Sequence, residues 1–449
     1  MKIEVCTVGG FEEVGKNMTA VKVGDEVVIF DMGLMIPALI ELEEDEHLSR
    51  KDLTKKQLIS LNVIPDDSVI NKWKSKVKAI VISHAHLDHV GGVPYLAPDY
   101  KCPVIGTPYT IEILKSILQD EKIKIPNQLN VLKAGRTLTI SKNLKIEFIN
   151  ITHSTIQCVF IALHTAAGVI VYANDFKLDR NPVLGKKPDF KRMKNLGKSG
   201  KVKLLIMDSL YSQADMKTPS ESVAREMLKD VMFGIDLKDH ALFVTTFASH
   251  ISRLYSIVEF GRKLKRKVLF LGRSLHKYTV AAENIKAVKL SKHVEILSYR
   301  SQIKKRLKEV QENPGKYLIV CTGNQGEPRA VLPRIANDEY HFKFKPGDSV
   351  IFSCKTIPDP LNIAQRVALE KKLDKKGVRI FKDIHVSGHG SREDLRETVK
   401  LLNPMHLIPS HGSSAQLMPM VELSKKMGYK FGKTVHLVHD SQFLIIDNI

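Results

Sequence analysis

The segment 77–92 constrains this chain more strongly than any other stretch of its 449 residues. It begins with an apolar run, Val77–Ile82, that has the length and composition of a buried strand. Packing or surface exposure usually explains a single histidine, but not the density of metal-ligating groups that follows. These groups are His84, His86, Asp88 and His89. We therefore expect a metal site at the end of this strand.

The spacing of these residues favours two metal ions. His84 and His86 lie two positions apart in an extended segment, so both side chains project to the same side. If the chain then turns into a helix, Asp88 and His89 can face a neighbouring ion. Two divalent ions about 3.5–4 Å apart can activate a bridging hydroxide and hold the attacking and leaving oxygens of a displacement.

Two ions require more ligands than this one segment supplies. Other strand-like runs lead to His153, Asp175 and His411, which are the further candidates. Asp175 is suited to bridge the ions, because an anion between two cations offsets their repulsion. We therefore expect all three residues to lie beside the segment 77–92.

Composition excludes several classes of protein. Hydrophobic residues make up 43% and charged residues 26% of the chain, as in an ordinary globular protein. No apolar run approaches the ~18 residues of a membrane span, and the N-terminus carries charges where a signal peptide would be apolar. The five cysteines are scattered without a CxxC pair, so we expect neither disulfides nor a thiolate zinc site. This pattern favours a cytoplasmic protein with reduced thiols.

The formal net charge of +20 is the first indication of a partner. A basic surface attracts polyanions and speeds their encounter. Nucleic acid is one such polyanion, although adaptation to heat or to an unusual cytosol would also give this charge. The basic run Arg180–Lys203 is either a solvated surface segment or a lip that contacts phosphate, and the acidic run Glu41–Glu46 is expected to be a solvated loop.

The pattern of apolar runs predicts an α/β protein with two layered parts. Strands and helices such as Thr110–Leu118 alternate in the first third, and Ser209–Ile357 is expected to form a parallel-sheet domain with helices at Ser220–Met232 and Ile303–Gln311. The expected strands are Ile3–Val8, Val27–Phe30, Val77–Ile82, Leu144–Ile149, Val159–Leu163, Val169–Tyr172, Leu204–Met207, Leu242–Thr245, Val268–Leu271, Tyr317–Cys321, Ser349–Ser353, Val435–His439 and Phe443–Ile446.

The order of these motifs resembles the metallo-β-lactamase fold. Asp31, the cluster His84–His89, His153 and Asp175 follow its motif sequence. The basic middle region and the C-terminal histidine motifs resemble the β-CASP branch, whose members cut nucleic acids. Three stretches are similar to ribonuclease J in particular: GGFEEVGKNM at 9–18, TGNQGEP at 322–328 and HVSGHG at 385–390.

The resemblance implies an α/β fold in which a metallo-β-lactamase αββα sandwich carries an inserted β-CASP domain. The sandwich would be formed by residues 1–208 and 358–449, and the β-CASP domain by residues 209–357. Bacterial ribonuclease J proteins usually carry a further C-terminal domain, so we expect the shorter archaeal form. The active site would lie between the two domains.

The resemblance also implies two zinc ions per chain, with manganese as an alternative because nitrogen and oxygen ligands accept both metals. The first ion would be held by His84, His86, His153 and Asp175, and the second by Asp88, His89, Asp175 and His411. Asp31 would orient a ligand imidazole through a hydrogen bond.

Catalysis would fall to Asp88 and Asp175 and to a pair formed by His389 and Asp208. His389 would contact the scissile phosphate and donate a proton to the leaving 3′ oxygen, since the pKa of an imidazole lies close to the operating pH. Two simpler interpretations stay open, in which Asp208 caps a helix and His385 forms a structural hydrogen bond.

RNA would be held by small residues and arginines. The turn from Gly388 to Ser391 could cradle a phosphate with its backbone N–H groups, and arginine binds phosphate in a bidentate manner. In ribonuclease J, positions matching Ser249 and Ser387 are associated with the 5′ monophosphate. The full set expected to bind RNA is Ser249, Arg253, Arg273, Ser274, His385, Ser387, Gly388, His389 and Gly390.

These observations favour a two-metal ribonuclease, a processive 5′-to-3′ exonuclease on single-stranded RNA with a 5′ monophosphate, acting in RNA decay or maturation. The resemblance also implies a homodimer. Three alternatives stay open. The protein could be an endonuclease resembling RNA 3′-end processing factors, or an RNA-binding protein whose site has decayed. A small-molecule hydrolase such as a thioesterase is disfavoured by the charge and by the inserted domain.

Overall fold

The computed structural model describes residues 2–44, 52–357 and 360–446. The chain divides into two compact units. Unit 1 combines Met1–Arg180, Lys186–Thr218 and Gly388–Ile449, and unit 2 combines Asn181–Gly185 and Pro219–Ser387. No helix among the described residues is long and apolar enough to cross a membrane. All five cysteines are buried and free, so the expectation of no disulfides is confirmed.

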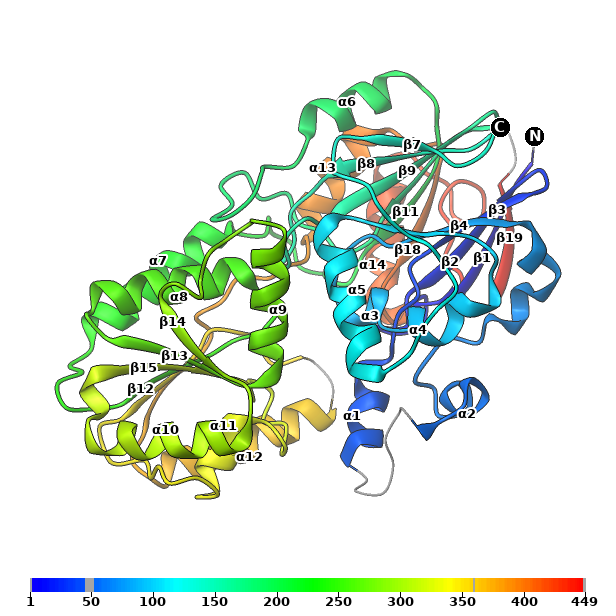
Figure 1. Ribbon diagram of the computed structural model, residues 1–449. Helices are drawn as coiled ribbons and strands as arrows, with labels where there is room; N and C mark the ends of the chain where they lie inside the picture. The colour runs from blue at the N-terminus through cyan, green and yellow to red at the C-terminus, as the bar shows by residue number, and fades with distance from the viewer. Residues whose placement is uncertain (1, 45–51, 358–359, 447–449) are drawn as a thin grey trace. The chain divides into compact units, whose positions relative to one another are not determined.

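Unit 1 contains two mixed sheets that pack face to face (Figure 1). The first has the order β19-β1-β2-β3-β4-β5-β6, with strands β1 (Ile3–Gly9), β2 (Met18–Val23), β3 (Glu26–Phe30), β4 (Val77–Val81), β5 (Val104–Gly106), β6 (Leu129–Val131) and β19 (Gln442–Ile446). The second has the order β18-β11-β10-β9-β8-β7, with strands β7 (Thr137–Thr139), β8 (Lys145–Asn150), β9 (Val159–Thr165), β10 (Gly168–Ala173), β11 (Val202–Asp208) and β18 (His406–Ser410).

The central strands of unit 1 are buried on both faces, which explains why they are continuous apolar runs and do not alternate with polar residues. Phe30, Val81, Phe148 and Tyr172 belong to the core between the two sheets. On the outer face of the second sheet, a further core is formed with α6 (Phe190–Lys198), α13 (Arg392–Leu402) and α14 (Ser414–Lys426).

Helices on the outside complete an αββα sandwich (Figure 1). The first sheet is accompanied by α3 (Leu87–Val90), α4 (Val93–Leu96) and α5 (Pro108–Glu121), of which α5 contacts β5 and β6. Among the described residues of unit 1, the other helical segments are α1 (Ile36–Glu44), α2 (Lys55–Ser60), η2 (Asp67–Lys76) and η3 (Ala97–Asp99).

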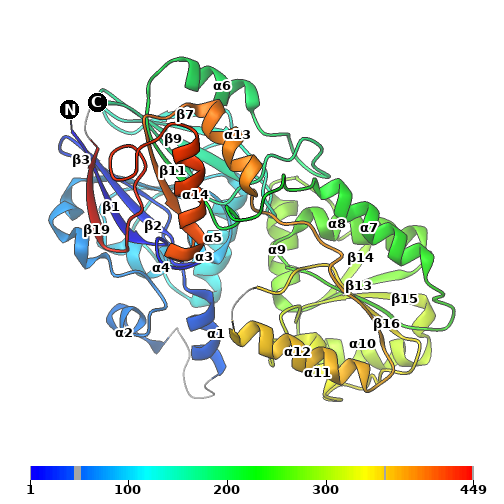
Figure 2. The same cartoon turned by 180° about the vertical axis from the view of Figure 1, so that it is seen from behind.

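Unit 2 is a layered domain whose described strands all pair in parallel (Figure 2). Their order is β14-β13-β15-β12-β16-β17, with β12 (Leu242–Thr245), β13 (Lys267–Leu271), β14 (Val294–Leu297), β15 (Tyr317–Cys321), β16 (Ser349–Phe352) and β17 (Arg379–Phe381). The helices on its two faces are α7 (Glu221–Gly234), α8 (Ile251–Lys263), α9 (Arg273–Asn284), α10 (Arg300–Glu312), α11 (Val331–Ala336) and α12 (Pro360–Asp374), with a short η4 (Pro314–Lys316).

The expected fold class is confirmed, but three details differ. β17 pairs with β16, so the sheet of unit 2 extends beyond Ile357 and this unit ends at Ser387 instead. The strand expected at Val435–His439 is wrong, because only isolated bridges form there, at Val435. Of the acidic run expected to be a loop, residues 41–44 belong to α1, and residues 45 and 46 lie outside the described residues.

Candidate metal centre

Residues at the ends of five strands of unit 1 lie close together. They include four of the expected metal ligands and Asp31, which forms a hydrogen bond to a ligand. Three of these residues have left-handed backbones, with φ of 58° at Asp31, 50° at Asp175 and 65° at His411. Aspartate and histidine tolerate this region better than most residues, yet it costs on the order of 1–3 kcal/mol and persists only where the surroundings enforce it. The residues that follow these strands are Asp31 after β3, His84 after β4, His153 after β8, Asp175 after β10 and His411 after β18.

Two groups of four potential ligands result, and within each group the ligating atoms lie within 4.8 Å of one another. They share Asp175, which is buried at the centre. The first group is His84, His86, His153 and Asp175. The second group is Asp88, His89, Asp175 and His411. The structure thus brings together all seven residues expected to bind metal.

The carboxylate of Asp175 faces both groups, one oxygen to each. Its Oδ2 lies 3.5 Å from Nε2 of His84 and 3.5 Å from Nε2 of His153. Its Oδ1 lies 3.2 Å from Nε2 of His89 and 3.6 Å from Nε2 of His411. Asp88 completes the second group, with Oδ2 at 3.4 Å from Nε2 of His89. This is the arrangement of a bridging carboxylate.

Hydrogen bonds fix which ring nitrogen each imidazole presents. His89 donates from Nδ1 to Oδ2 of Asp31 at 2.7 Å, and His153 donates from Nδ1 to the carbonyl of Gly388 at 2.8 Å. His84 lies with Nδ1 at 3.0 Å from the hydroxyl of Ser83, which in turn donates to Asp31. These three rings therefore turn their Nε2 lone pairs inward, as a metal ligand requires, whereas His86 presents Nδ1.

Asn17 supports the second group, and the sequence had not singled it out as a site residue. Its Oδ1 lies 3.0 Å from Nδ1 of His411, and its Nδ2 donates to the backbone carbonyl of Asp88 at 3.0 Å. Asn174 donates to the same Oδ1. The only signal available was that Asn17 belongs to the stretch 9–18 that resembles ribonuclease J.

The pKa values divide the site into neutral and charged groups. Burial, and then the charge of His84, lowers the pKa of His86 to about 3, and burial also lowers the pKa of His84 and His153. Burial would raise the pKa of Asp175, but the charges of His411 and His89 hold it well below its usual value. His89 differs, because burial would lower its pKa but the charges of Asp175, Asp88 and Asp31 raise it well above its usual value. Divalent metals bind neutral imidazoles and ionised carboxylates, so a metal held by His89 would replace a proton.

This donor set fits two divalent cations. Oδ1 of Asp175 is buried and has no hydrogen-bond partner among the described residues, although a buried carboxylate oxygen normally has one. Nδ1 of His86 lies only 3.2 Å from Nε2 of His84 and 3.1 Å from Nε2 of His153. The three nitrogens of the first group converge beside Oδ2 of Asp175, and the unpartnered Oδ1 faces the second group, so each group suits a cation of its own.

His389 and Asp208 form a pair at the edge of the two groups. His389 donates from Nδ1 to Oδ2 of Asp208 at 2.8 Å, and its Nε2 lies 3.9 Å from Oδ2 of Asp175. Burial would lower the pKa of His389, but the charges of Asp208 and then Asp175 raise it to about 9. No helix begins at Asp208, whose Oδ1 instead accepts from the backbone N–H of Leu210, so the helix-cap interpretation is wrong.

The backbone N–H groups of the turn at 388–391 were expected to bind phosphate, but two of them form hydrogen bonds within unit 1. The N–H of Gly390 donates to the carbonyl of Phe176, and the N–H of Ser391 donates to the hydroxyl of Thr218 at 2.8 Å. These two groups are therefore used within the fold, and their assignment to phosphate is wrong. Gly388 contributes its carbonyl to His153, and a Cβ at Gly388 would lie 2.9 Å from that ring.

Arg253 is a structural residue of unit 2, so the expected phosphate contact is also wrong. Its side chain is fully buried. Nε and Nη2 donate to the two carboxylate oxygens of Glu221 at 2.6 and 2.9 Å, and Nη1 donates to the carbonyl of Ser353 at 2.8 Å and of Ile384 at 3.0 Å. A fully buried guanidinium held by these partners is not accessible to RNA.

The other residues expected to bind RNA belong to unit 2. Ser249 follows β12 and is buried, whereas Arg273 and Ser274 are exposed at the start of α9, directly after β13. Because β12 and β13 belong to one parallel sheet, these residues share its carboxyl edge. His385 and Ser387 are half-buried near the end of the unit. Their role in RNA binding stays a prediction.

Family models cover most of the chain. A β-lactamase superfamily domain matches residues 66–229, and the metallo-β-lactamase superfamily matches residues 12–118. The ribonuclease J β-CASP domain matches residues 239–368, and a Zn-dependent metallo-hydrolase RNA specificity domain matches residues 376–438. A solved structure, a protein of unknown function from Enterococcus faecalis V583, has a TM-score of 0.66 at 17% identity and covers 99% of this chain and 100% of its own, which bears on the fold alone.

Individual relatives extend over the full length. The chain is 44% identical to ribonuclease J of Methanocaldococcus jannaschii over 451 residues, covering 100% of both. It is 45% identical to ribonuclease J of Pyrococcus abyssi, covering 97% of this chain and 95% of the relative. Ribonuclease J of Thermus thermophilus is 31% identical, over 96% of this chain and 72% of the relative.

The fold and the histidine–aspartate centre define a metallo-β-lactamase-type protein with a β-CASP domain. Within that class, the full-length similarity is to one group of proteins. The chain belongs to the ribonuclease J family, as the motifs had indicated.

Proposed function

We propose that this protein is a metal-dependent ribonuclease, a processive 5′-to-3′ exonuclease that prefers single-stranded RNA with a 5′ monophosphate and serves RNA decay or maturation. The single observation that supports it most is the carboxylate of Asp175, which faces two separate ligand groups with its two oxygens. Membership of the ribonuclease J family indicates the substrate class, and the charge of +20 is consistent with a polyanionic substrate.

In this proposal the two ligand groups hold two zinc ions, or manganese in their place. The bound metals supply an activated water and neutralise charge on the scissile phosphate. Asp175 bridges the two positions, and Asp31 keeps His89 and, through Ser83, His84 in the orientation that presents Nε2. Asn17 does the same for His411.

His389 is the proposed proton donor to the leaving 3′ oxygen. Asp208 holds Nδ1 of His389, so that its Nε2 is directed toward Asp175 and the ligand groups. A proton on this Nε2 is stabilised by the carboxylates of Asp208 and Asp175. After the proton is transferred, the hydrogen bond to Asp208 keeps the ring in place for reprotonation.

The test uses one RNA labelled separately at each end and bearing either a 5′ monophosphate or a 5′ triphosphate. We expect stepwise release of mononucleotides from the 5′ end, faster with the monophosphate. A covalently closed circular RNA is the matched control, since it has no end to start from. Cutting of the circle would instead favour the endonuclease alternative, and absence of all cleavage by metal-loaded protein would favour an RNA-binding protein without activity.

We also propose that the protein is a homodimer, as the resemblance implied. Sedimentation equilibrium checks this directly. A mass of about one chain at micromolar concentration would exclude the dimer without affecting the proposed chemistry, because all seven expected metal ligands belong to one chain.

A further inference from the structure

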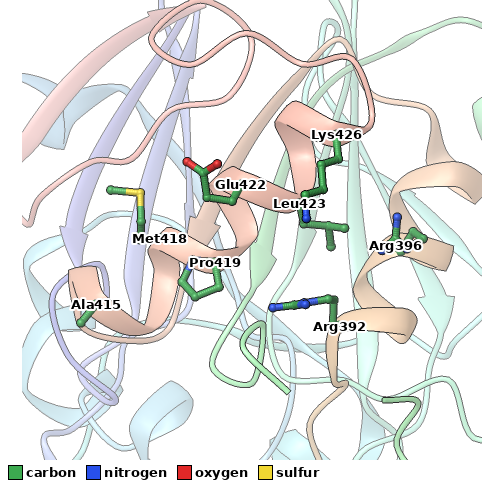
Figure 3. A pocket seen from close by; sticks show the side chains of 8 residues that line it. All are labelled: Arg392, Arg396, Ala415, Met418, Pro419, Glu422, Leu423 and Lys426. Atoms are coloured by element: carbon green, nitrogen blue, oxygen red, sulfur yellow. The ribbon is translucent and has the colours of Figure 1, made fainter. Parts of the chain in front are cut away.

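A groove on unit 1, between α13 and α14, is not used by the proposed hydrolysis. Two adjoining hollows of about 520 and 550 Å³ have Arg396 and Lys426 in common. Figure 3 shows the first hollow, with Arg392 and Arg396 on α13 facing Met418, Pro419 and Lys426 on α14. The second continues past Lys400, Met405 and Tyr429.

The groove starts beside the candidate metal centre. α13 begins at Arg392, three residues after His389, and α14 begins at Ser414, three residues after His411. Between them, β18 runs back toward the centre, so both helices lead away from it along the same sheet. Helices of this length extend about 16–20 Å. The groove therefore extends about that length from the starts of the two helices over the outside of unit 1.

Positive charge predominates along the groove. Lys400 and Lys426 form no ion pair with any described residue, so both ammonium groups are available to a ligand. The two arginines already have partners: Arg392 donates from Nε to the carbonyl of Ser212 at 2.9 Å and pairs with Asp215 at 3.6 Å, and Arg396 pairs with Glu393 at 3.1 Å. Among the described residues, the two lysines are therefore the unpaired cations of the groove. The acid in the lining, Glu422, is paired with Lys425 at 3.1 Å.

The groove also has an apolar floor that a simple anion would not need. Met418 is 39% exposed and Met405 is 37% exposed, and Pro419 and Leu423 lie between the cations. Methionine sulfur makes favourable contacts with aromatic rings, and single strands bind where charged groups follow the backbone and side chains contact the bases. A single-stranded polynucleotide matches both features. Both helices also fall within the matched RNA specificity domain.

We propose that the α13–α14 groove is a binding track for single-stranded RNA that leads away from the metal centre. The link between this track and catalysis rests on the proposed ribonuclease function. The charge and shape of the groove do not depend on that function. It would hold a part of the RNA beyond the nucleotides at the scissile bond, and so would affect long substrates more than short ones.

The test reverses two charges in the full chain, with Lys400→Glu and Lys426→Glu combined. The matched control combines Lys124→Glu with Lys142→Glu, which are exposed lysines of unit 1 outside the groove and change the net charge equally. Binding of uridine oligomers of about 5 and about 20 nucleotides is measured by fluorescence anisotropy in a chelator, which prevents hydrolysis. Circular dichroism confirms that both variants fold.

We expect the groove variant to bind the long oligomer about tenfold more weakly, and the slope of log K against log salt to fall by about 1.4, the value for two lost phosphate contacts on a single strand. The short oligomer should bind and be hydrolysed as by the unmodified protein. An equal loss of RNA affinity in the control variant, or an equal loss of affinity for both oligomers, would refute the proposed binding track. So would a change in sedimentation coefficient with RNA binding unchanged, because the groove would then be an interface between copies.

The two proposals fail in different ways. If the protein cuts no RNA but the groove variant still loses affinity for the long oligomer, the ribonuclease proposal fails and the track stands. If the protein cuts RNA and the groove variant binds long RNA normally, the track fails and the ribonuclease proposal stands.

Discussion

Each unit contains a buried charged side chain, and the two side chains differ in their hydrogen-bond partners. In unit 2, the guanidinium of Arg253 is completely buried, and its donors meet two carboxylate oxygens and two backbone carbonyls. In unit 1, the buried carboxylate of Asp175 has an oxygen without a hydrogen-bond partner among the described residues, surrounded by imidazole nitrogens directed toward it. The first charge has its hydrogen-bond partners within the protein, whereas one oxygen of the second lies near imidazoles without forming a hydrogen bond to them.

This difference separates a structural charge from a binding site. A buried ion pair with matched partners holds elements together, and removing one partner leaves an uncompensated charge. A convergent set of donors that the protein does not satisfy needs a ligand from outside. Arginine in a sequence suggests phosphate binding in either case, so the partners decide which interpretation holds.

The largest expected effect is that of Asp175→Ala. Because both groups share this carboxylate, its loss should remove hydrolysis of RNA entirely and lower bound metal from two ions to one or none per chain. Elemental analysis and a cleavage assay on metal-loaded protein measure both quantities. Retention of two ions and of activity would refute the bridging role.

His389→Ala should separate catalysis from metal binding. His389 belongs to neither group of four ligands, although it lies with Asp208 and Asp175 in a smaller cluster of potential ligands. We therefore expect two ions to remain bound, while the cleavage rate falls about 10²–10⁴-fold, the usual contribution of a general acid. Asp208→Asn should lower the cleavage rate less, because it weakens the hydrogen bond at Nδ1 of His389 but leaves the imidazole in place. A variant that loses metal together with activity would show that His389 is a ligand and not a proton donor.

Arg253→Leu tests the satisfied charge of unit 2. Leaving Glu221 buried without this partner should lower the free energy of unfolding by about 3–5 kcal/mol, with metal content unchanged. Urea denaturation followed by circular dichroism measures the loss. Arg262→Leu on the same helix is the control, because Arg262 is exposed and its replacement should change stability by no more than about 0.5 kcal/mol.

Asp31→Asn should weaken the metal centre without removing a ligand. Asp31 accepts hydrogen bonds from His89 and from Ser83, so an amide in its place disturbs the orientation of two imidazoles. Such outer hydrogen bonds contribute about 10–100-fold to metal affinity or activity. Competition with a chelator measures the affinity, and an unchanged value would contradict the support assigned to Asp31.

The smallest effect concerns a histidine pair outside the ligand groups. The rings of His406 and His436 are stacked, with their centroids 5.4 Å apart. Burial, and then the charge of His406, lowers the pKa of His436 to about 4. The pKa in the unfolded chain is about 6.5. The folded state therefore binds fewer protons, and the contribution of neutral His436 is present above pH about 6.5 and is lost as pH falls toward about 4.

We expect His436→Gln to remove this dependence. The free energy of unfolding of the unmodified chain, measured in urea at a series of pH values, should fall more steeply over that window than that of the variant. Parallel curves for the two proteins would show that His436 titrates normally in the folded state.

The sequence predicted the metal centre better than its surroundings. His84 to His89 stand together after an apolar strand, so local composition was sufficient to identify them. His153, Asp175 and His411 were candidates because each follows a strand-like run, and the resemblance to a known family supported them, since no local pattern shows that distant strand ends meet. The left-handed turns at Asp175 and His411, and the support by Asn17, depend on tertiary structure and could not be derived from spacing.

The structural role of Arg253 and the boundaries of unit 2 could not be predicted from the sequence. The partners of Arg253 lie 32 residues before it, at Glu221, and 100 residues after it, at Ser353. Short strands such as β5 and β17 have three residues each, too few for a pattern, and their pairing with neighbours defines them. The limits of the sheet in unit 2 therefore could not be derived from the apolar runs alone.

Anomalous X-ray scattering at the zinc edge, from crystals grown with zinc, tests the centre most directly. Our account predicts two peaks about 3.5–4 Å apart, one on each side of the Asp175 carboxylate. The first should lie among His84, His86 and His153, and the second among Asp88, His89 and His411. A single peak, or zinc bound away from Asp175, would contradict the two-metal centre.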